Sequence, residues 1–310
     1  MEQKPVIAIS AATSFTGAWI AKTLHEKGWK VIAHTAEKQN ECTGILAKRI
    51  RLLGLLDEPV IFGIRAEDGS MEALIRRVRP GVWINHHHWM AGFRSPGYDR
   101  KKALEIGVDP LTGLVKALSD SDCKGIIQTG SYFEPGEAGR GAEAHITPYA
   151  QSKCDVWRAL HAEAAGRGLA LSKCVIPDPV GPLENEDRLI PLMIKKARSG
   201  DELVMNAPNI CADRLPVEYL ARVYDWLARG LLDGNSSIAR PSGRVSTNLA
   251  WVQFVNEELI TKRLGLAACP VRVNADPALE KLGDHRNNKE EAAKIDWDAS
   301  WDFYARHING

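Results

Sequence analysis

Tyr149 and Lys153 are the residues whose types and spacing best fit proton transfer. They open a predicted helix over residues 149–167, and a separation of four residues puts both side chains on one helical face. A nearby ammonium favours the phenolate, so we expect Lys153 to lower the pKa of Tyr149, which then exchanges a proton with a substrate hydroxyl or carbonyl. A surface tyrosine beside a solvated lysine has the same spacing, so the pair needs support from its surroundings.

That support comes from a hydroxyl upstream in the chain. The segment Gln128-Thr129-Gly130-Ser131 closes a predicted strand. Ser131 therefore falls at the carboxyl edge of a sheet, where doubly wound folds bind their ligands. It is placed to hydrogen-bond the same substrate oxygen as Tyr149. Thr129 competes for this role, and an ordinary polar transition from strand to loop is the alternative.

Alternating strands and helices predict the fold that positions these residues. Short apolar runs predict strands at residues 6–10, 30–34, 59–62, 82–85, 125–128 and 169–175. Helical periodicity falls between them, at residues 17–24, 70–78, 102–119 and 149–167. This alternation is typical of an α/β protein with a Rossmann-type doubly wound parallel sheet.

The pattern changes beyond about Pro177. Helices are predicted at residues 189–199, 217–231 and 249–264, and a tryptophan-rich segment follows at residues 297–301. We expect residues 1–180 to form a dinucleotide-binding core. Residues 181–310 are expected to form a small, mostly helical substrate lobe, partly intertwined with that core.

Composition narrows the class of partner. The 40 Lys and Arg against 39 Asp and Glu leave a formal net charge of +1, so no global field attracts nucleic acid or an anionic membrane surface. The six cysteines lack C-x-x-C spacing and are expected to be reduced thiols. No apolar run reaches membrane-spanning length, and residues 1–5 enter the first strand without an apolar leader. We expect a cytoplasmic protein with a small-molecule substrate.

These segments together resemble the extended short-chain dehydrogenase/reductase family, in its NAD-dependent epimerase/dehydratase group typified by UDP-glucose 4-epimerases. The resemblance spans the first turn, Ser131, the Tyr149 and Lys153 pair and residues 175–182 and 188–195. It implies hydride exchange between a nicotinamide dinucleotide and a sugar carbon. Tyr149 is then the acid and base, Lys153 also binds the nicotinamide ribose, and Ser131 orients the substrate.

Relatives in this family commonly dimerise through two helices, which correspond here to residues 102–119 and 149–167. A homodimer is therefore expected. The resemblance and the residue types give these cofactor-binding candidates: Ala11, Thr13, Ser14, Phe15, Thr16, His34, Thr35, Lys38, Arg65, His86, His87, His88, Thr129, Lys153, Pro177 and Val180. The substrate-binding candidates are Ser131, Tyr132, Tyr149, His88, Arg188 and Arg214.

The nucleotide half of the site departs from the family pattern. Where relatives carry G-x-x-G-x-x-G, this chain has Ala11-Ala-Thr-Ser14-Phe-Thr-Gly17 and keeps only the third glycine. Ala and Ser are small enough for the tight turn to persist at some loss of affinity, and a weakened or lost dinucleotide site is the alternative. No acidic residue stands at the tip of the second strand. Basic His34 and Lys38, with Arg65 further on, suit a 2′-phosphate, so NAD and NADP both remain open.

The segment Asn85-His86-His87-His88 stands where relatives have a small-residue segment of the H-L-A-A kind. Adjacent side chains of an extended segment point to opposite faces, so at most His86 and His88 converge. We expect histidines that line the site, and no metal. Gly107 stands where relatives have an asparagine. The contribution of that asparagine to a proton relay is therefore in question in this chain.

Two further departures bear on the reaction. Sugar-nucleotide dehydratases follow the catalytic hydroxyl with an Asp-Glu pair, whereas Tyr132 and Phe133 follow Ser131 here, so dehydration is not expected. Ala212 stands where relatives bind pyrophosphate through an arginine, and Arg214 is the candidate substitute.

Three functions remain open from the sequence. The first is an NAD(P)-dependent epimerase or 4-keto reductase acting on a nucleotide sugar. The second is an NADPH-dependent carbonyl reductase acting on a non-sugar ketone, and the third is a non-catalytic nucleotide-sensing protein. Retention of Tyr149, Lys153 and Ser131 together argues against the third.

Overall fold

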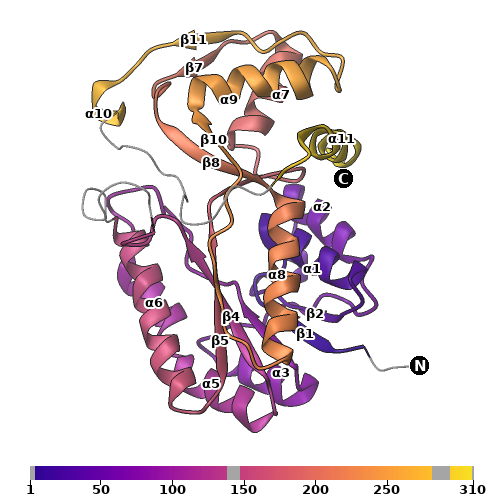
Figure 1. Cartoon of the computed structure of the whole chain (residues 1–310), viewed down its shortest axis with the longest axis vertical. Helices are drawn as coiled ribbons and strands as arrows, with labels where there is room; N and C mark the ends of the chain where they lie inside the picture. The colour runs from indigo at the N-terminus through magenta and orange to yellow at the C-terminus, as the bar shows by residue number, and fades with distance from the viewer. Residues whose placement is uncertain (1–3, 138–146, 281–293, 309–310) are drawn as a thin grey trace.

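A six-stranded parallel sheet forms the centre of the computed structural model, which describes residues 4–137, 147–280 and 294–308 (Figure 1). The strand order is β2-β1-β3-β4-β5-β9. The strands are β1 Val6–Ile9, β2 Lys30–Ala33, β3 Val82–Asn85, β4 Gly125–Ser131, β5 Ala170–Ile176 and β9 Ile238–Ala239. The chain winds outward from β1 in both directions, which confirms the predicted Rossmann-type doubly wound class. The point where the order reverses, between β1 and β3, is where such sheets bind ligands.

Helices cover both faces of the sheet. One face is covered by α1 Phe15–Glu26, α2 Gly44–Leu53 and α8 Val217–Leu232. The other is covered by α3 Ser70–Val78, α5 Leu111–Asp120 and α6 Pro148–Ala165. Successive residues of a strand point to opposite faces of the sheet. In β1, Ile7 and Ile9 pack against the first set of helices and Ala8 packs against the second.

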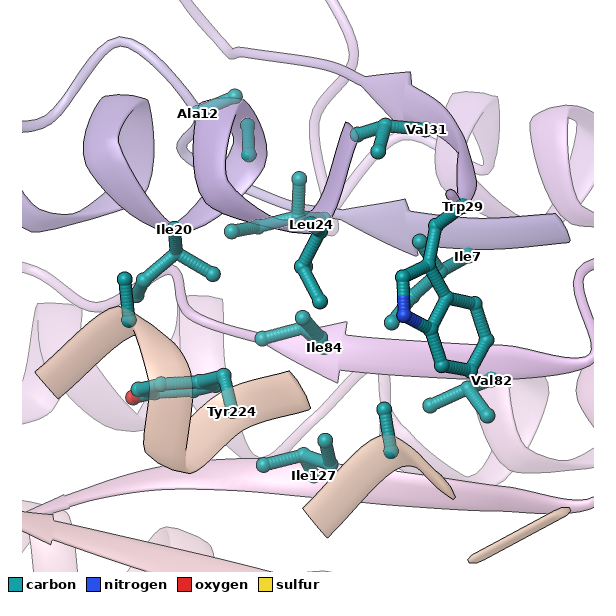
Figure 2. Packing of buried hydrophobic residues seen from close by; sticks show 14 of the residues in the cluster. Ile7, Ala12, Ile20, Leu24, Trp29, Val31, Val82, Ile84, Ile127 and Tyr224 are labelled. Atoms are coloured by element: carbon teal, nitrogen blue, oxygen red, sulfur yellow. The ribbon is translucent and has the colours of Figure 1, made fainter. Parts of the chain in front are cut away.

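The first layer is shown close up in Figure 2, where Ile20 and Leu24 of α1 lie over the strands and Tyr224 enters from α8. All three side chains are fully buried. Burying a large apolar side chain stabilises a fold by roughly 1.5–3 kcal/mol. Because α8 lies well beyond residue 180, the chain returns from the lobe to complete the core.

The lobe is mostly helical, as predicted, and it also contains two small sheets that were not predicted. One sheet has the order β10-β8-β6 and the other has β11-β7. The strands are β6 Asp178–Val180, β7 Leu203–Met205, β8 Cys211–Pro216, β10 Arg244–Thr247 and β11 Val271–Val273. They are short, and β8 buries the charged Asp213 and Arg214, so no apolar alternation marks them in the sequence.

The helices of the lobe are α7 Leu189–Ser199, α9 Asn248–Val255, α10 Pro277–Glu280 and α11 Trp297–His307. A π-helical stretch, Asn256–Thr261, follows α9 and replaces the end of the predicted helix 249–264. Trp251 and Trp301 stack in the apolar centre of the lobe with their ring centroids 5.7 Å apart. No helix in the described ranges is long and apolar enough to cross a membrane.

Two predicted elements differ from the structure for reasons of backbone chemistry. The predicted helix 102–119 is divided into α4 Arg100–Gly107 and α5, because Pro110 disfavours helical geometry in the residue before it. The predicted strand 59–62 is reduced to one bridge between His34 and Ile61. Pro59 has no N–H to donate to a ladder, and Gly63 turns the chain at φ 71°. Helix α2 and a 3₁₀ turn, Gln39–Glu41, were not predicted.

The junction between sheet and lobe is held by two buried side chains from the first helical layer. Trp19 donates from Nε1 to the Pro182 carbonyl at 2.8 Å. Arg49 of α2 donates to the Leu183 carbonyl from Nε at 3.0 Å and from Nη2 at 2.7 Å. Leu183 has φ 67°, a left-handed conformation that is costly for a residue with a side chain. Arg49 thus stabilises a strained turn at the entrance to the lobe.

His34 is fully buried against Trp83, with ring centroids 5.1 Å apart, and neither ring nitrogen has a hydrogen-bond partner. Burial lowers the pKa of His34 to about 3. The unfolded chain, with a histidine pKa near 6.5, binds more protons between those two values. Acidification from pH 7 to pH 5 therefore favours unfolding by about 2 kcal/mol through this residue alone.

We expect His34→Leu to raise the free energy of unfolding at pH 7 by about 1–2 kcal/mol, because the variant removes unsatisfied buried nitrogens at similar volume. It also weakens the loss of stability between pH 7 and pH 5. Urea unfolding at both pH values measures the two effects, and His161→Gln on the exposed surface of α6 is the control. A variant less stable than the parent protein, with the same pH dependence, would contradict this account.

Candidate active site

The turn after β1 keeps the shape of a glycine turn without its first two glycines. Ala11 adopts φ 50°, the left-handed conformation in which glycine is usual. Ser14 caps α1 by accepting the Gly17 N–H at 3.1 Å. A Cβ on Gly17 would lie 2.5 Å from the Ala11 carbonyl oxygen, so the retained glycine is required for the turn to close on the helix. This N-terminus of α1 can bind an anionic group.

An acidic side chain that the sequence analysis missed lies beside this turn. Glu37 accepts hydrogen bonds at Oε2 from the Thr13 hydroxyl, at 3.0 Å, and from the Thr35 hydroxyl. The two threonine hydroxyls are themselves 2.7 Å apart. Glu37 lies four residues beyond β2, and its carboxylate returns to the strand tip where a nucleotide-binding fold places the acid for a ribose diol. These residues fit a dinucleotide that carries a free 2′-hydroxyl.

The prediction that His34 supplies a positive charge at the strand tip is therefore wrong. His34 is buried and its lowered pKa keeps it neutral, so it offers no charge to a 2′-phosphate. Lys38 and Arg65 are exposed. The backbone of Arg65 is bonded at both its N–H and its carbonyl to the Ser70 hydroxyl. Glu37, an acid, is the charged side chain that contacts Thr13 and Thr35.

The three consecutive histidines point to different partners. His86 bonds Thr16 at 2.9 Å through Nε2 and Thr129 at 2.7 Å through Nδ1, and so connects the start of α1 with β4. His87 Nδ1 lies 3.1 Å from the Ser10 hydroxyl. The described parts of the chain contain no group of three or more His, Cys, Asp or Glu side chains placed to bind a metal.

All three histidines are neutral because burial depresses their basicity. Burial, with the nearby charge of Lys153, lowers the pKa of His86 to about 3 and that of His87 to about 4. The pKa of His88 falls well below its ordinary value for the same reasons. The segment is thus a polar, uncharged wall near Lys153.

His88 lies against Tyr149. Its ring packs edge-on to Tyr149 with centroids 5.6 Å apart, and its Nε2 bonds the Ser152 hydroxyl at 3.0 Å. Tyr98, a residue the sequence analysis missed, also packs edge-on to Tyr149 at 5.7 Å. Gly107 approaches this group so closely that a Cβ there would lie 2.7 Å from Val156 Cγ2. An asparagine at that position would require the Val156 side chain to move.

The predicted Ser131, Tyr149 and Lys153 come together at the carboxyl end of β4. The Tyr149 phenol lies near the Ser131 hydroxyl, whose influence lowers the pKa of Tyr149 against the larger effect of burial. Lys153 donates from Nζ to the Thr129 carbonyl at 3.2 Å. All three are buried. Helix α6 places Tyr149 in its first turn, because Thr147 caps the helix through Ala150 N and Pro148 follows at the first helical position.

The electrostatics of this group differ from the expectation. Burial raises the pKa of Tyr149 above its ordinary value, and the nearby Ser131 hydroxyl opposes that shift. Lys153 is not a cause of the shift, so the expected lowering by the lysine is absent from this state. Burial lowers the pKa of Lys153 to about 8. The group is therefore a protonated phenol beside an amine that titrates near neutral pH.

The remaining candidates lie mostly around the start of the lobe. Tyr132 is buried near Asp178 and both predicted arginines. Arg188 is held by Glu184 at 2.6 Å and by Asp178 at 2.8 Å. Arg214 donates to the Ser246 carbonyl at 2.8 Å and to Asn248. Both guanidinium groups are thus already bound by groups of the chain itself.

Three cofactor candidates are placed by packing. The Phe15 side chain joins Trp19 in the apolar cluster that contacts the lobe. Val180 lies at the end of β6 and packs into the apolar centre of the lobe, so its predicted cofactor contact through the side chain is not supported. Pro177 is buried between β5 and β6. Thr129 contributes its hydroxyl to His86 and its carbonyl to Lys153.

A doubly wound sheet with Ser131, Tyr149 and Lys153 at one strand end defines an enzyme of the extended short-chain dehydrogenase/reductase type. The chain belongs to the NAD dependent epimerase/dehydratase family, whose model matches residues 7–228. This confirms the resemblance inferred from the sequence. A comparison with curated protein sequences finds no match.

Solved structures of similar fold cover essentially the whole chain. The UDP-glucose 4-epimerase of Thermus thermophilus in complex with NAD has a TM-score of 0.72 at 14% identity, over 98% of this chain and 99% of that one. The UDP-N-acetylglucosamine 4-epimerase of Methanobrevibacter ruminantium, in complex with UDP-N-acetylmuramic acid, has a TM-score of 0.74 at 15% identity. The match covers 100% of this chain and 99% of that one. The UDP-glucose 4-epimerase of Brucella ovis in complex with NAD has a TM-score of 0.71 at 17% identity, over 98% of each chain. At these identities the likeness establishes the fold.

We expect Gly17→Ala to destabilise the turn by about 1–3 kcal/mol, because the new Cβ must displace the Ala11 carbonyl or the Ser14 cap. Urea unfolding measures the loss. Gly166→Ala, where a Cβ meets no atom closer than 3.5 Å, is the matched control and should change stability by less than about 0.5 kcal/mol. Equal stability of the two variants would show that the turn does not depend on Gly17.

Proposed function

We propose that this protein is an NAD-dependent epimerase or oxidoreductase that transfers a hydride at a hydroxyl or keto carbon of a nucleotide sugar, with Tyr149 as proton donor and acceptor. The observation that carries the proposal is that Ser131, Tyr149 and Lys153 are buried together at the carboxyl edge of the sheet, with Lys153 bonded to the Thr129 carbonyl of the same strand. The family match and the epimerase neighbours support the reaction class.

Each side chain has a role in this proposal. Glu37 accepts from the adenosine ribose, and the first turn of α1 binds the pyrophosphate. Bound NAD supplies the hydride acceptor. Lys153 binds the nicotinamide ribose, and its ammonium stabilises the Tyr149 phenolate that forms when the proton moves. Ser131 orients the substrate oxygen toward Tyr149.

One observation favours a second candidate, a carbonyl reductase acting on a non-sugar ketone. Arg188, predicted to bind substrate, and Arg214, the candidate for binding pyrophosphate, are already bound by the chain. Asp178 lies 2.8 Å from Arg188. A nucleotide diphosphate has to compete with these partners. Glu37, an acid, argues against NADPH in either case.

The predicted homodimer and cytoplasmic location stay predictions. In the described part of the chain, the large exposed apolar side chains lie outside α4, α5 and α6, the helices expected to pair. Trp226 of α8 is 58% exposed and is the most prominent exposed ring. A dimer through α5 and α6 would therefore depend on polar and small side chains.

A nucleotide panel tests the cofactor. We expect NAD⁺ and NADH to raise the melting temperature, since a ligand at 100 times its dissociation constant adds about 2.7 kcal/mol, and NADP⁺ and NADPH to have little effect. Glu37→Gln should reduce the preference for NAD⁺ over NADP⁺ at least tenfold, because it removes the negative charge that repels a 2′-phosphate. Glu41→Gln, on the exposed 3₁₀ turn nearby, is the control. A larger shift with NADPH than with NADH would refute the assignment.

The proton-transfer role is tested with Tyr149→Phe, which keeps the ring and removes the hydroxyl. We expect a loss of at least about 100-fold in kcat for interconversion of UDP-glucose and UDP-galactose, with the NAD⁺-induced melting shift retained. Chromatography of the sugar nucleotides measures turnover, and Tyr219→Phe on α8 is the control. Full activity of the Tyr149 variant would remove the proposed acid and base. If the parent turns over no UDP-sugar but reduces a simple ketone, the second candidate replaces the first.

A further inference from the structure

A buried carboxylate closes the loop that carries Ser131. Glu134 accepts the Ser131 N–H at Oε1, at 2.8 Å, and its own N–H donates to the Ser131 carbonyl at 3.0 Å. The Ser131 hydroxyl in turn accepts the Phe133 N–H at 3.2 Å and lies near the Tyr149 phenol. The orientation of Ser131 toward Tyr149 is thus set by a turn that Glu134 holds.

The second oxygen of Glu134 pairs with a lysine from the middle of the sheet. Lys173 of β5 donates from Nζ to Glu134 Oε2 at 2.6 Å, and the two side chains are 3% and 2% exposed. Lys173 Nζ also lies 5.0 Å from the ring centroid of Trp157 on α6. The pair therefore lies between the sheet and the helix that carries Tyr149 and Lys153.

Gly130 makes room for this pair. A Cβ at that position would lie 2.5 Å from Lys173 Cε and 2.8 Å from Glu134 Oε1. Replacing a buried ion pair by apolar residues of similar volume is often neutral or stabilising, so stability alone is a weak reason to bury two charges here. Their position beside the proton-transfer residues suggests a reason in the chemistry.

Two buried charges act on Lys153, and one of them also acts on Tyr149. The carboxylate of Glu134 favours the charged form of Lys153 and raises its pKa, whereas Lys173 lowers it, both against the larger effect of burial. Glu134 also raises the pKa of Tyr149, as Tyr98 does. The ring of neutral His88 completes the surroundings of Tyr149.

We propose that Glu134 is a positioning residue for proton transfer, with Lys173 as its buried counter-ion: its carboxylate holds the turn that presents the Ser131 hydroxyl beside Tyr149, and its charge acts on Lys153. This rests on the proposed role of Tyr149 as acid and base. Glu134 does not need to touch the substrate. It acts through Ser131 by a hydrogen bond and through Lys153 by its charge.

The chain contains a matched arrangement away from these residues. Glu184 accepts the Gly181 N–H at Oε1, at 2.9 Å, and pairs through Oε2 with Arg188 at 2.6 Å. In both loops a buried glutamate thus accepts a hydrogen bond from the backbone N–H of the residue three positions before it. Glu184 contributes to the pKa shift of neither Lys153 nor Tyr149. It therefore serves as a control for the loss of a buried carboxylate.

The test is a direct titration of Lys153 in the full-length protein without cofactor or substrate. Protein labelled with [ε-¹³C]lysine is titrated by NMR, and the Lys153 signal is assigned with Lys153→Arg. Glu134→Gln keeps an oxygen for the Ser131 amide and removes the charge, so we expect the Lys153 midpoint to fall by about one pH unit or more. Lys173→Met is expected to raise the midpoint, and Glu184→Gln to leave it unchanged.

An unchanged Lys153 midpoint in folded Glu134→Gln, or shifts of the same sign in the Glu134 and Lys173 variants, would overturn the proposal. If Glu134→Gln does not fold, the double variant with Lys173→Met removes both buried charges and should show a smaller fall in the midpoint; no fall there overturns the proposal as well. Because this titration uses no nucleotide or substrate, its outcome is separate from that of the nucleotide panel and the Tyr149→Phe assay.

Discussion

The approach of Ser131 to Tyr149 is the contact on which the organisation of the site depends. It joins the carboxyl end of β4 to the first turn of α6, two elements that have to be placed independently. Strand β4 is fixed by its ladders with β3 and β5, and the start of α6 is fixed by the Thr147 cap and Pro148. A small displacement of either element would separate the two hydroxyl oxygens. The strands and helices that hold β4 and α6 in place therefore also determine how these two oxygens lie.

Burial governs the chemistry around that contact. It keeps the histidine segment neutral, raises the pKa of Tyr149 and lowers that of Lys153 toward neutral pH. In such surroundings a single charge acts strongly, because water does not screen it. The buried ion pair between Glu134 and Lys173 therefore acts more strongly on neighbouring groups than an exposed pair of the same geometry would.

The elements that carry chemistry were predictable because their signals are local. Strand periodicity, the four-residue spacing of Tyr149 and Lys153 and the polar end of β4 all lie within short segments. The polar contacts that complete the site were not predictable in this way. Glu37 contacts Thr13 only because the loop after β2 turns back, and Lys173 meets Glu134 across neighbouring strands. His34 was misassigned because its sequence position does not reveal that its ring enters the core.

The central claim is that one edge of the sheet binds a dinucleotide between Glu37 and Lys153 with Tyr149 at the reacting end. A crystal structure with NAD⁺ tests it most directly. The account predicts the adenosine ribose on Glu37, the pyrophosphate at the start of α1 and the nicotinamide ribose on Lys153. Density for NAD⁺ elsewhere, with Glu37 still bonded to Thr13 and Thr35 and Lys153 to the Thr129 carbonyl, would contradict it.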